Sequence, residues 1–193
     1  MQSLCFTLDL PDWIPTFLAE RPDPCAGVES RMRLVIDLAA GNVEFATGGP
    51  FGAAVFHEDT GRLIAVGVNR VVATNCSLAH AEMIALALAQ QRLATWDLAA
   101  THRCQLVTST EPCAMCLGAI PWSGVSSVVT GARDEDARAL GFDEGAKPHE
   151  WAHTLTARGI AVVRDVLRQD ACQVLQAYQA AGGALYNSAY QKP

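Results

Sequence analysis

The sequence predicts an α/β fold with three layers, in which a mixed sheet of mostly five strands lies between helices on both faces. Two observations predict this arrangement: a pair of short apolar runs separated by a tight turn, and then a regular alternation of helical periodicity with further apolar runs. The composition agrees, because 50% of the 193 residues are hydrophobic and 18% are charged. A chain of this length and composition has room for one domain with a substantial core.

The first third of the chain contains an arm, a helix and a hairpin. Residues 1–27 hold four prolines and no clear period, so we expect an irregular arm or a short strand there. Apolar residues recur at helical spacing over residues 28–45, and the turn-forming Gly48-Gly49-Pro50 ends that helix. Two strands joined as a hairpin by Asp59-Thr60-Gly61 follow, over residues 52–56 and 63–68.

The remainder of the chain alternates helices with strands. Residues 80–93 are rich in Ala, Leu and Gln and predict a helix, and residues 104–108 predict a short apolar strand. Proline favours the first turn of a helix, so a second helix is expected from Pro112 to about Trp122. The other expected elements are strands over 125–130 and 160–163, helices over 134–140, 148–157 and 170–181, and a polar tail over 184–193. No linker divides the chain, and we predict a single domain over residues 1–193.

Charge and cysteine content narrow the class of protein. The net charge is −6 and the basic residues are scattered, so nucleic acid is not the expected partner. No apolar stretch is long enough to cross a membrane, and the N-terminus lacks the pattern of a secretory signal. Seven cysteines, an odd number, argue for a reducing compartment. We therefore expect a cytoplasmic protein with no membrane partner.

Two short motifs carry the chemistry. His80-Ala81-Glu82 and Pro112-Cys113-Ala114-Met115-Cys116 each open a predicted helix. Cys113 and Cys116 are three residues apart, so a helix places them on one face at its first turn, where the helix dipole favours thiolates. One imidazole and two thiolates form a three-ligand shell for Zn²⁺ that leaves a fourth position for water, which is the pattern of a catalytic zinc site.

Glu82 adds an acid–base group to this site. It lies two residues after His80, about 200° further around a regular helix, so the two side chains converge only beyond the N-terminal end of that helix. A carboxylate placed there can take a proton from water and return it to a substrate. One alternative is a cysteine pair that is redox-active or merely buried. Another is a closed structural zinc site completed by His102 or Cys104. None of these alternatives gives Glu82 a function.

The two motifs resemble the H-x-E…P-C-x-x-C pattern of the cytidine deaminase-like superfamily. Three further segments look like bacterial guanine deaminases: Gly49-Pro50-Phe51-Gly52-Ala53-Ala54-Val55, Asn69-Arg70-Val71 and Phe142-Asp143-Glu144-Gly145. The resemblance implies a cytidine deaminase-like fold, a Zn²⁺ cofactor and hydrolytic deamination of a small purine, guanine, to xanthine and ammonia.

The resemblance also implies residue roles. Glu82 would shuttle protons, Asn69 would hydrogen-bond the purine and Phe51 would pack on the base plane. Glu144, with Asp143 beside it, would bring a second carboxylate, which suits the adjacent N1–H and 2-amino donors of guanine because a carboxylate only accepts. Further candidates for lining the substrate site are Ala81 and Trp122.

Each of these residues has a structural alternative. Asn69 is also a common turn residue after a strand, and Phe51 also suits a core position at a strand start. Acidic residues such as Asp143 and Glu144 are usually solvated, and Trp122 fits equally well beneath the pocket as within it.

Alternative functions and the assembly follow from the same motifs. A guanosine deaminase, a cytosine- or adenine-type deaminase of the same superfamily, and a zinc-stabilised binding protein without activity are the competing hypotheses. The net negative charge counts against a tRNA adenosine deaminase.

We expect a homodimer, with Gly182-Gly183 as a hinge for exchange of C-terminal segments between subunits, as guanine deaminases often show. The tail tyrosines Tyr186 and Tyr190 are candidates for capping the site.

Overall fold

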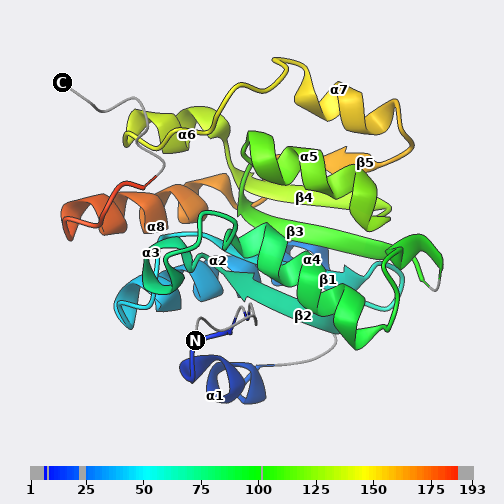
Figure 1. Cartoon of the computed structure of the whole chain (residues 1–193), viewed down its shortest axis with the longest axis horizontal. Helices are drawn as coiled ribbons and strands as arrows, with labels where there is room; N and C mark the ends of the chain where they lie inside the picture. The colour runs from blue at the N-terminus through cyan, green and yellow to red at the C-terminus, as the bar shows by residue number, and fades with distance from the viewer. Residues whose placement is uncertain (1–6, 8, 22–24, 101, 187–193) are drawn as a thin grey trace, which may run out of the picture.

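A computed structural model describes residues 7, 9–21, 25–100 and 102–186, and within them one five-stranded sheet is sandwiched between helices (Figure 1). The strand order is β2-β1-β3-β4-β5. The bounds are Gly52–His57 for β1, Leu63–Val68 for β2, Cys104–Thr110 for β3, Ser127–Ala132 for β4 and Ala161–Val163 for β5. Tyr190 and the rest of the tail after Tyr186 lie outside the described residues.

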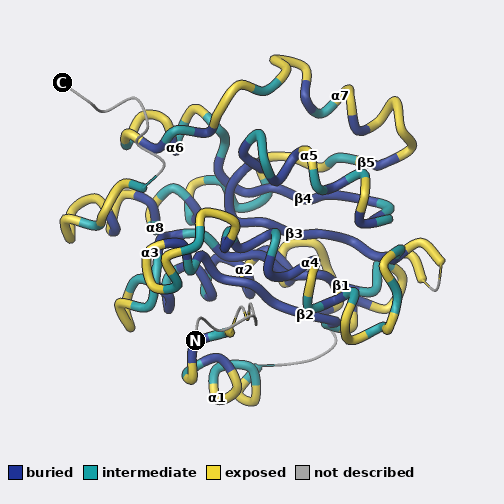
Figure 2. The backbone as a smooth tube through the Cα atoms, viewed as in Figure 1, coloured by how far each residue is buried: buried dark blue, intermediate teal, exposed yellow. Residues whose placement is uncertain are grey.

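The sheet is mixed, as predicted. β1 runs antiparallel to both β2 and β3, whereas β3, β4 and β5 are parallel to one another. The antiparallel half comes from the predicted hairpin, and the parallel half from connections that pass through helices, since parallel neighbours need a crossover. All strands except β5 are almost fully buried (Figure 2).

Helices cover both faces and complete the three layers. One apolar cluster joins the sheet to α1 (Trp13–Ala19), α2 (Val28–Glu44) and α8 (Arg168–Ala180). The other joins the opposite face to α4 (Ala81–Arg92), α5 (Ala114–Ser123) and α7 (Trp151–Thr156). The short elements α3 (Val71–Thr74), η1 (Leu98–Ala100) and α6 (Asp134–Ala139) lie in the connections.

The N-terminal arm differs from the prediction, because residues 13–19 form helix α1 rather than an irregular segment or a strand. Tertiary contacts explain the helix. Trp13 stacks on Phe45 with ring centroids 5.3 Å apart, and its indole N–H donates to the Thr47 hydroxyl at 3.0 Å. The Trp13 ring also lies against Gly41, where a Cβ atom would approach it to 3.0 Å. Neither α3 nor η1 was predicted.

The strand register brings distant segments to one end of the sheet. Ala53 pairs with Thr108 and Gly52 with Val68, so the residues just before β1, just after β2 and at the end of β3 are neighbours. The chain then enters α5 directly after β3, and α4 begins on the same face. No helix among the described residues has the length and apolar character needed to cross a membrane.

Candidate active site

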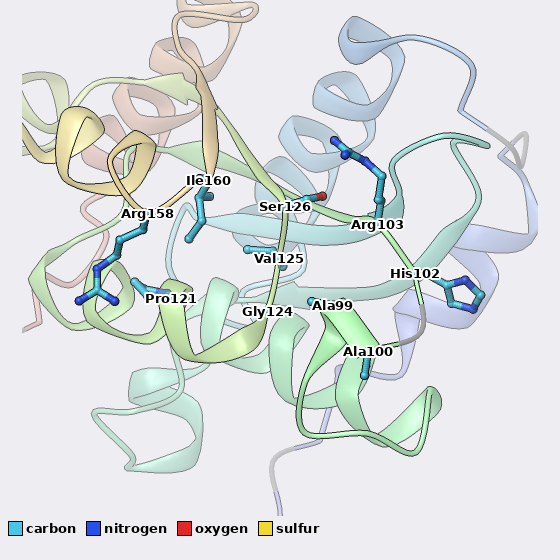
Figure 3. A pocket seen from close by; sticks show the side chains of 11 residues that line it. Ala99, Ala100, His102, Arg103, Pro121, Gly124, Val125, Ser126, Arg158 and Ile160 are labelled. Carbon is cyan, nitrogen blue, oxygen red and sulfur yellow. The ribbon is translucent and has the colours of Figure 1, made fainter.

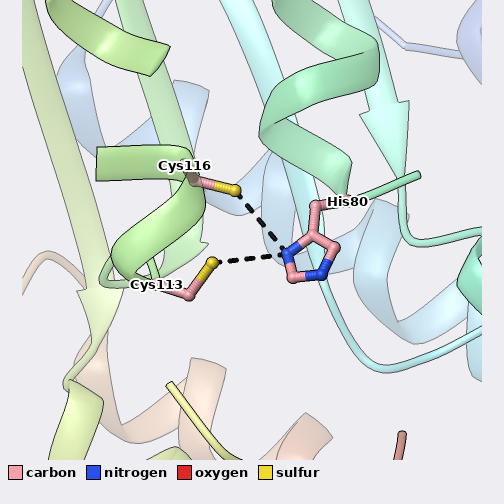
Figure 4. A group of neighbouring side chains, drawn as sticks. All are labelled: His80, Cys113 and Cys116. Carbon is pink, nitrogen blue, oxygen red and sulfur yellow. Dashed lines mark hydrogen bonds between the residues drawn. The ribbon is translucent and has the colours of Figure 1, made fainter. Parts of the chain in front are cut away.

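Three side chains meet where α4 and α5 begin. The Nδ1 atom of His80 lies 3.5 Å from the sulfur of Cys113 and 3.6 Å from that of Cys116 (Figure 4). A tetrahedral zinc ion, with Zn–S of about 2.3 Å and Zn–N of about 2.0–2.1 Å, holds nitrogen and sulfur ligands about 3.5–3.6 Å apart. The three ligand atoms therefore have the spacing that zinc requires, and within the described residues they form the one His/Cys/Asp/Glu cluster that could hold a metal.

The local backbone explains why these side chains converge. His80 and Cys113 are both N-cap residues with extended backbone, at ψ 152° and 173°, so each side chain projects beyond the end of its helix. Cys116 lies in the first turn of α5 and is fully buried. The positive ends of two helix dipoles face the thiolates. Hydrogen bonds from the Cys116 thiol and from His80 lower the pKa of Cys113 to about 4.

A small cavity of about 20 Å³ adjoins this cluster. Its lining combines metal ligands, carboxylates and aromatic rings: Phe51, His80, Glu82, Thr110, Glu111, Cys113, Phe142, Glu144 and Tyr186. The volume admits about one water molecule. Tyr186, from the C-terminal segment, helps to fill the space. Its ring packs against that of Phe142, with the ring centroids 5.5 Å apart. Gly49 permits this approach, since a Cβ atom there would lie 2.2 Å from the tyrosine oxygen.

Glu82 lies in the first turn of α4 and is 7% exposed. It lines the same cavity as His80, as the sequence required for a site beyond the helix end. Burial, and after it the negative sulfur of Cys113, raises the pKa of Glu82. A proton-transfer group therefore lies beside the metal ligands.

Glu144 is the second buried carboxyl group, at 7% exposure. Burial is the main cause that raises its pKa to about 8, and the Cys113 sulfur adds to it. Its loop is tied to the cysteine segment, because the Ala114 N–H donates to the Glu144 carbonyl and the Lys147 ammonium donates to the Pro112 carbonyl, each at 2.9 Å. The position of Glu144 is thus linked to that of Cys113.

Asp143 lies on the outer side of the same loop. Its carboxylate accepts the Gly145 N–H at 2.8 Å, so it closes a turn. It lines a neighbouring cavity of about 260 Å³, whose lining also includes Glu144, Ser77, Met115 and the ligands His80 and Cys113. The structure therefore brings Glu144, and not Asp143, into the cavity with Glu82.

The largest cavity described lies elsewhere. It measures about 530 Å³ and is lined by residues that precede β3, β4 and β5 (Figure 3). These are the opposite ends of the strands from those that lead to the metal ligands. Figure 3 shows its two arginines, Arg103 and Arg158, on opposite sides, and Arg103 pairs with Glu58 at 3.1 Å. None of the metal-ligand cluster found among the described residues lines this cavity, so it is not the candidate site.

Comparison with known proteins agrees with this geometry. The sequence model of the cytidine and deoxycytidylate deaminase zinc-binding region matches residues 28–132. The chain belongs to this family. It is 40% identical to guanine deaminase of Bacillus subtilis over 116 residues, which are 60% of this chain and 71% of that protein.

Two solved structures extend the likeness of this deaminase over nearly its whole length. A structure of guanine deaminase from Nitrosomonas europaea is 47% identical, with a TM-score of 0.87, and the match covers 93% of this chain and 99% of that one. A structure of a variant protein in complex with 8-azaguanine is 49% identical, also with a TM-score of 0.87, and covers 92% and 98% of the two chains. Fold, family and zinc requirement are therefore those that the motifs predicted.

Of the other residues predicted to contact the substrate, only some lie at the cavity beside the metal ligands. Phe51 borders the cavity and packs edge-on against Phe142, with centroids 5.0 Å apart. Asn69 is buried directly after β2, and its side-chain oxygen accepts the Val71 N–H at 3.3 Å, which is the turn role that was the alternative. Ala81 packs in the core. Trp122 is 84% exposed and does not line the cavity, so the structure gives no support to its predicted substrate role.

Sequence reasoning missed Thr110, Glu111 and the lining role of Phe142. Glu111 is 3% exposed and is held by Arg164, whose Nε donates to it at 2.7 Å. Thr110 and Glu111 directly precede the Pro-Cys motif, so the end of the strand was the signal that could have found them.

We expect the deaminase to hold one zinc ion per chain. Replacing both thiolates, with Cys113→Ser and Cys116→Ser, removes two of the three ligands and should reduce the zinc content to near zero by elemental analysis. Cys172→Ser, on α8, is the matched control and should retain full zinc. Full zinc in the double variant would contradict the assignment.

Proposed function

We propose that this deaminase hydrolyses guanine to xanthine and ammonia. In this reaction the oxygen of water becomes the 2-carbonyl oxygen of xanthine, and the 2-amino group leaves as ammonia. The observation that carries the proposal is the joint presence of Glu82 and Glu144 in the cavity beside the metal ligands. Family membership alone leaves the base open, because the family description names cytidine and deoxycytidylate. The relatives named guanine deaminase, and the 8-azaguanine complex, favour guanine.

The chain's residues divide the work by their chemistry. Bound zinc supplies a water of lowered pKa and so a nucleophile near neutral pH. Glu82 accepts a proton during attack and returns it to the departing amine. Ionised Glu144 accepts the N1–H and 2-amino donors of guanine with its two oxygens. Phe51 and Phe142, which pack edge-on against each other, together border the base, and Asn69 adds a hydrogen bond from the end of β2.

The cavity of about 20 Å³ is far smaller than ligand pockets of roughly 300 Å³ or more. A purine therefore needs more room than this cavity offers, and movement of the Tyr186 side chain, which lines the cavity, would provide it. The C-terminal segment acts as a cover for the site in this proposal, whether it belongs to the same subunit or to a partner.

Assembly and location belong to the same proposal. We place the enzyme in the cytoplasm as a homodimer that takes part in purine breakdown. Among the described residues, Cys76, Cys104, Cys113, Cys116 and Cys172 form no disulfide, which favours a reducing compartment. Large apolar side chains such as Trp122, Trp96 and Val72 are more than half exposed, and a partner subunit would cover part of such surface.

Glu82→Gln tests the proton-transfer role. The amide keeps the size of the side chain but cannot accept the proton, so guanine turnover measured by ammonia release should fall by at least about 10²–10⁴-fold. Zinc content should stay at the wild-type level. Near-wild-type turnover in a zinc-loaded variant would remove Glu82 from the mechanism.

Glu144→Gln, beside the matched variant Asp143→Asn, tests the substrate contact. The amide places a donor against a donor of guanine, and a hydrogen bond to a charged group is worth about 1.5–3 kcal/mol, so kcat/KM for guanine should fall at least about tenfold. Asp143→Asn should change it little, because that carboxylate closes a turn. Equal activity of both variants and the wild type would contradict the guanine assignment, and a loss confined to Asp143→Asn would move the role to that residue.

Light scattering tests the assembly. We expect a species of twice the chain mass of 20.6 kDa at micromolar concentration, since symmetric dimers are the commonest oligomers. A single species at the chain mass would exclude the homodimer.

A further inference from the structure

Two threonine hydroxyls on neighbouring parallel strands are buried without a partner. Thr110 on β3 is 3% exposed and Thr130 on β4 is fully buried. Neither Oγ1 atom has a hydrogen-bond partner among the described residues. Buried polar atoms in proteins are nearly always hydrogen-bonded, so each exception needs an explanation such as a bound molecule.

The strand alternation places Thr110 on the side of the metal ligands. Successive residues of a strand point to opposite faces. Leu106 belongs to the core cluster that contains α4 and α5, and Val107 to the cluster that contains α2. Thr110 is four residues after Leu106, so it shares the face of α4 and α5, and it lines the cavity beside Glu82 and Glu144.

Thr130 has the same chemistry in a different place. Its register partner on β3 is Thr108, two residues before Thr110. Thr130 does not line the cavity. The two residues are therefore a matched pair, because both are buried strand threonines with unpartnered hydroxyls and only one of them reaches the candidate site.

Few polar groups of the cavity can donate a hydrogen bond to a bound purine. Glu82 and Glu144 only accept when they are ionised, His80 and Cys113 are metal ligands, and Glu111 is held by Arg164. The Tyr186 hydroxyl is also buried without a partner among the described residues, but this side chain leaves the cavity when a purine enters in the proposed function. Guanine, however, presents acceptors, its ring nitrogens and 6-carbonyl oxygen, as well as donors. A hydroxyl donates as well as accepts, and Thr110 offers one from a rigid strand.

We propose that the Thr110 hydroxyl donates a hydrogen bond to an acceptor atom of the bound purine and so helps to determine substrate specificity. This contact rests on the proposed function, because it assumes a purine in the cavity. It exists in the bound ground state as well as in the transition state, so its loss raises KM more than it lowers kcat.

The experiment compares Thr110→Val with Thr130→Val, since valine keeps the shape and removes the hydroxyl. For zinc-loaded Thr110→Val we expect about a three- to tenfold rise in the KM for guanine, from the loss of one neutral hydrogen bond, with kcat changed less. The dissociation constant for 8-azaguanine, measured by calorimetry, should rise by a similar factor. Thr130→Val should match the wild type, and Thr110→Ser, which restores the hydroxyl, should recover most of the affinity.

Three results would overturn the contact. Unchanged KM and affinity in Thr110→Val mean that the hydroxyl serves an ordered water only. Loss of zinc or of thermal stability in Thr110→Val, with affinity for 8-azaguanine unchanged in the remaining folded holoenzyme, means that the hydroxyl supports the fold. Failure of Thr110→Ser to recover affinity excludes the hydroxyl as the cause. If the wild-type enzyme does not deaminate guanine, the proposed function fails separately, and 8-azaguanine binding still tests Thr110.

Discussion

The convergence of two helix N-termini at the end of β3 is the constraint on which the rest of the site depends. His80 and Cys113 cap α4 and α5, and their distance of 3.5 Å is maintained by the packing of both helices on one face of the sheet. A shift of either helix along the sheet would move a metal ligand. The buried strands beneath, with their fixed register, therefore act as the rigid platform that a preorganised site requires.

Charge balance links the metal to the two buried carboxyl groups. Burial raises the pKa of Glu82 and of Glu144, and the negative sulfur of Cys113 raises both further. A divalent cation held by His80, Cys113 and Cys116 would reverse that second influence, because a bound metal is the largest local charge in its site. Such an ion would also offset the negative charge that two ionised carboxylates bring into a nearly closed cavity.

The parts of the site that sequence could predict are those set by local spacing. Predicting that Cys113 and Cys116 lie on one face required only the geometry of one helical turn. Predicting the order of strands and helices required only the alternation of helical and strand periodicity in the apolar residues. Helix α1 was not predictable in this way, because it depends on Trp13 contacts with α2 and Phe45, which are remote in the chain. Thr110 and Trp122 show the same limit on prediction. Thr110 was missed and lines the cavity, whereas Trp122 was a candidate and lies exposed on the surface. In both cases the packing of other elements decides whether the side chain reaches the site.

The C-terminal segment joins the fold to the site through a short anchored connection. Helix α8 ends near Gly182, whose φ of +71° turns the chain back, and the Tyr178 hydroxyl donates to the Ala184 carbonyl at 2.7 Å. Tyr178 also packs beside Phe142, with ring centroids 6.1 Å apart, and Phe142 in turn contacts both Phe51 and Tyr186. Only one residue, Leu185, separates the anchored Ala184 from Tyr186. Because Ala184 holds the chain so close to Tyr186, Tyr186 can leave the cavity by side-chain rotation while Ala184 stays in place. Exchange of the whole segment between subunits is a larger change. It requires the chain to be redirected at Gly182-Gly183 and the hydrogen bond between Tyr178 and Ala184 to be made with the partner.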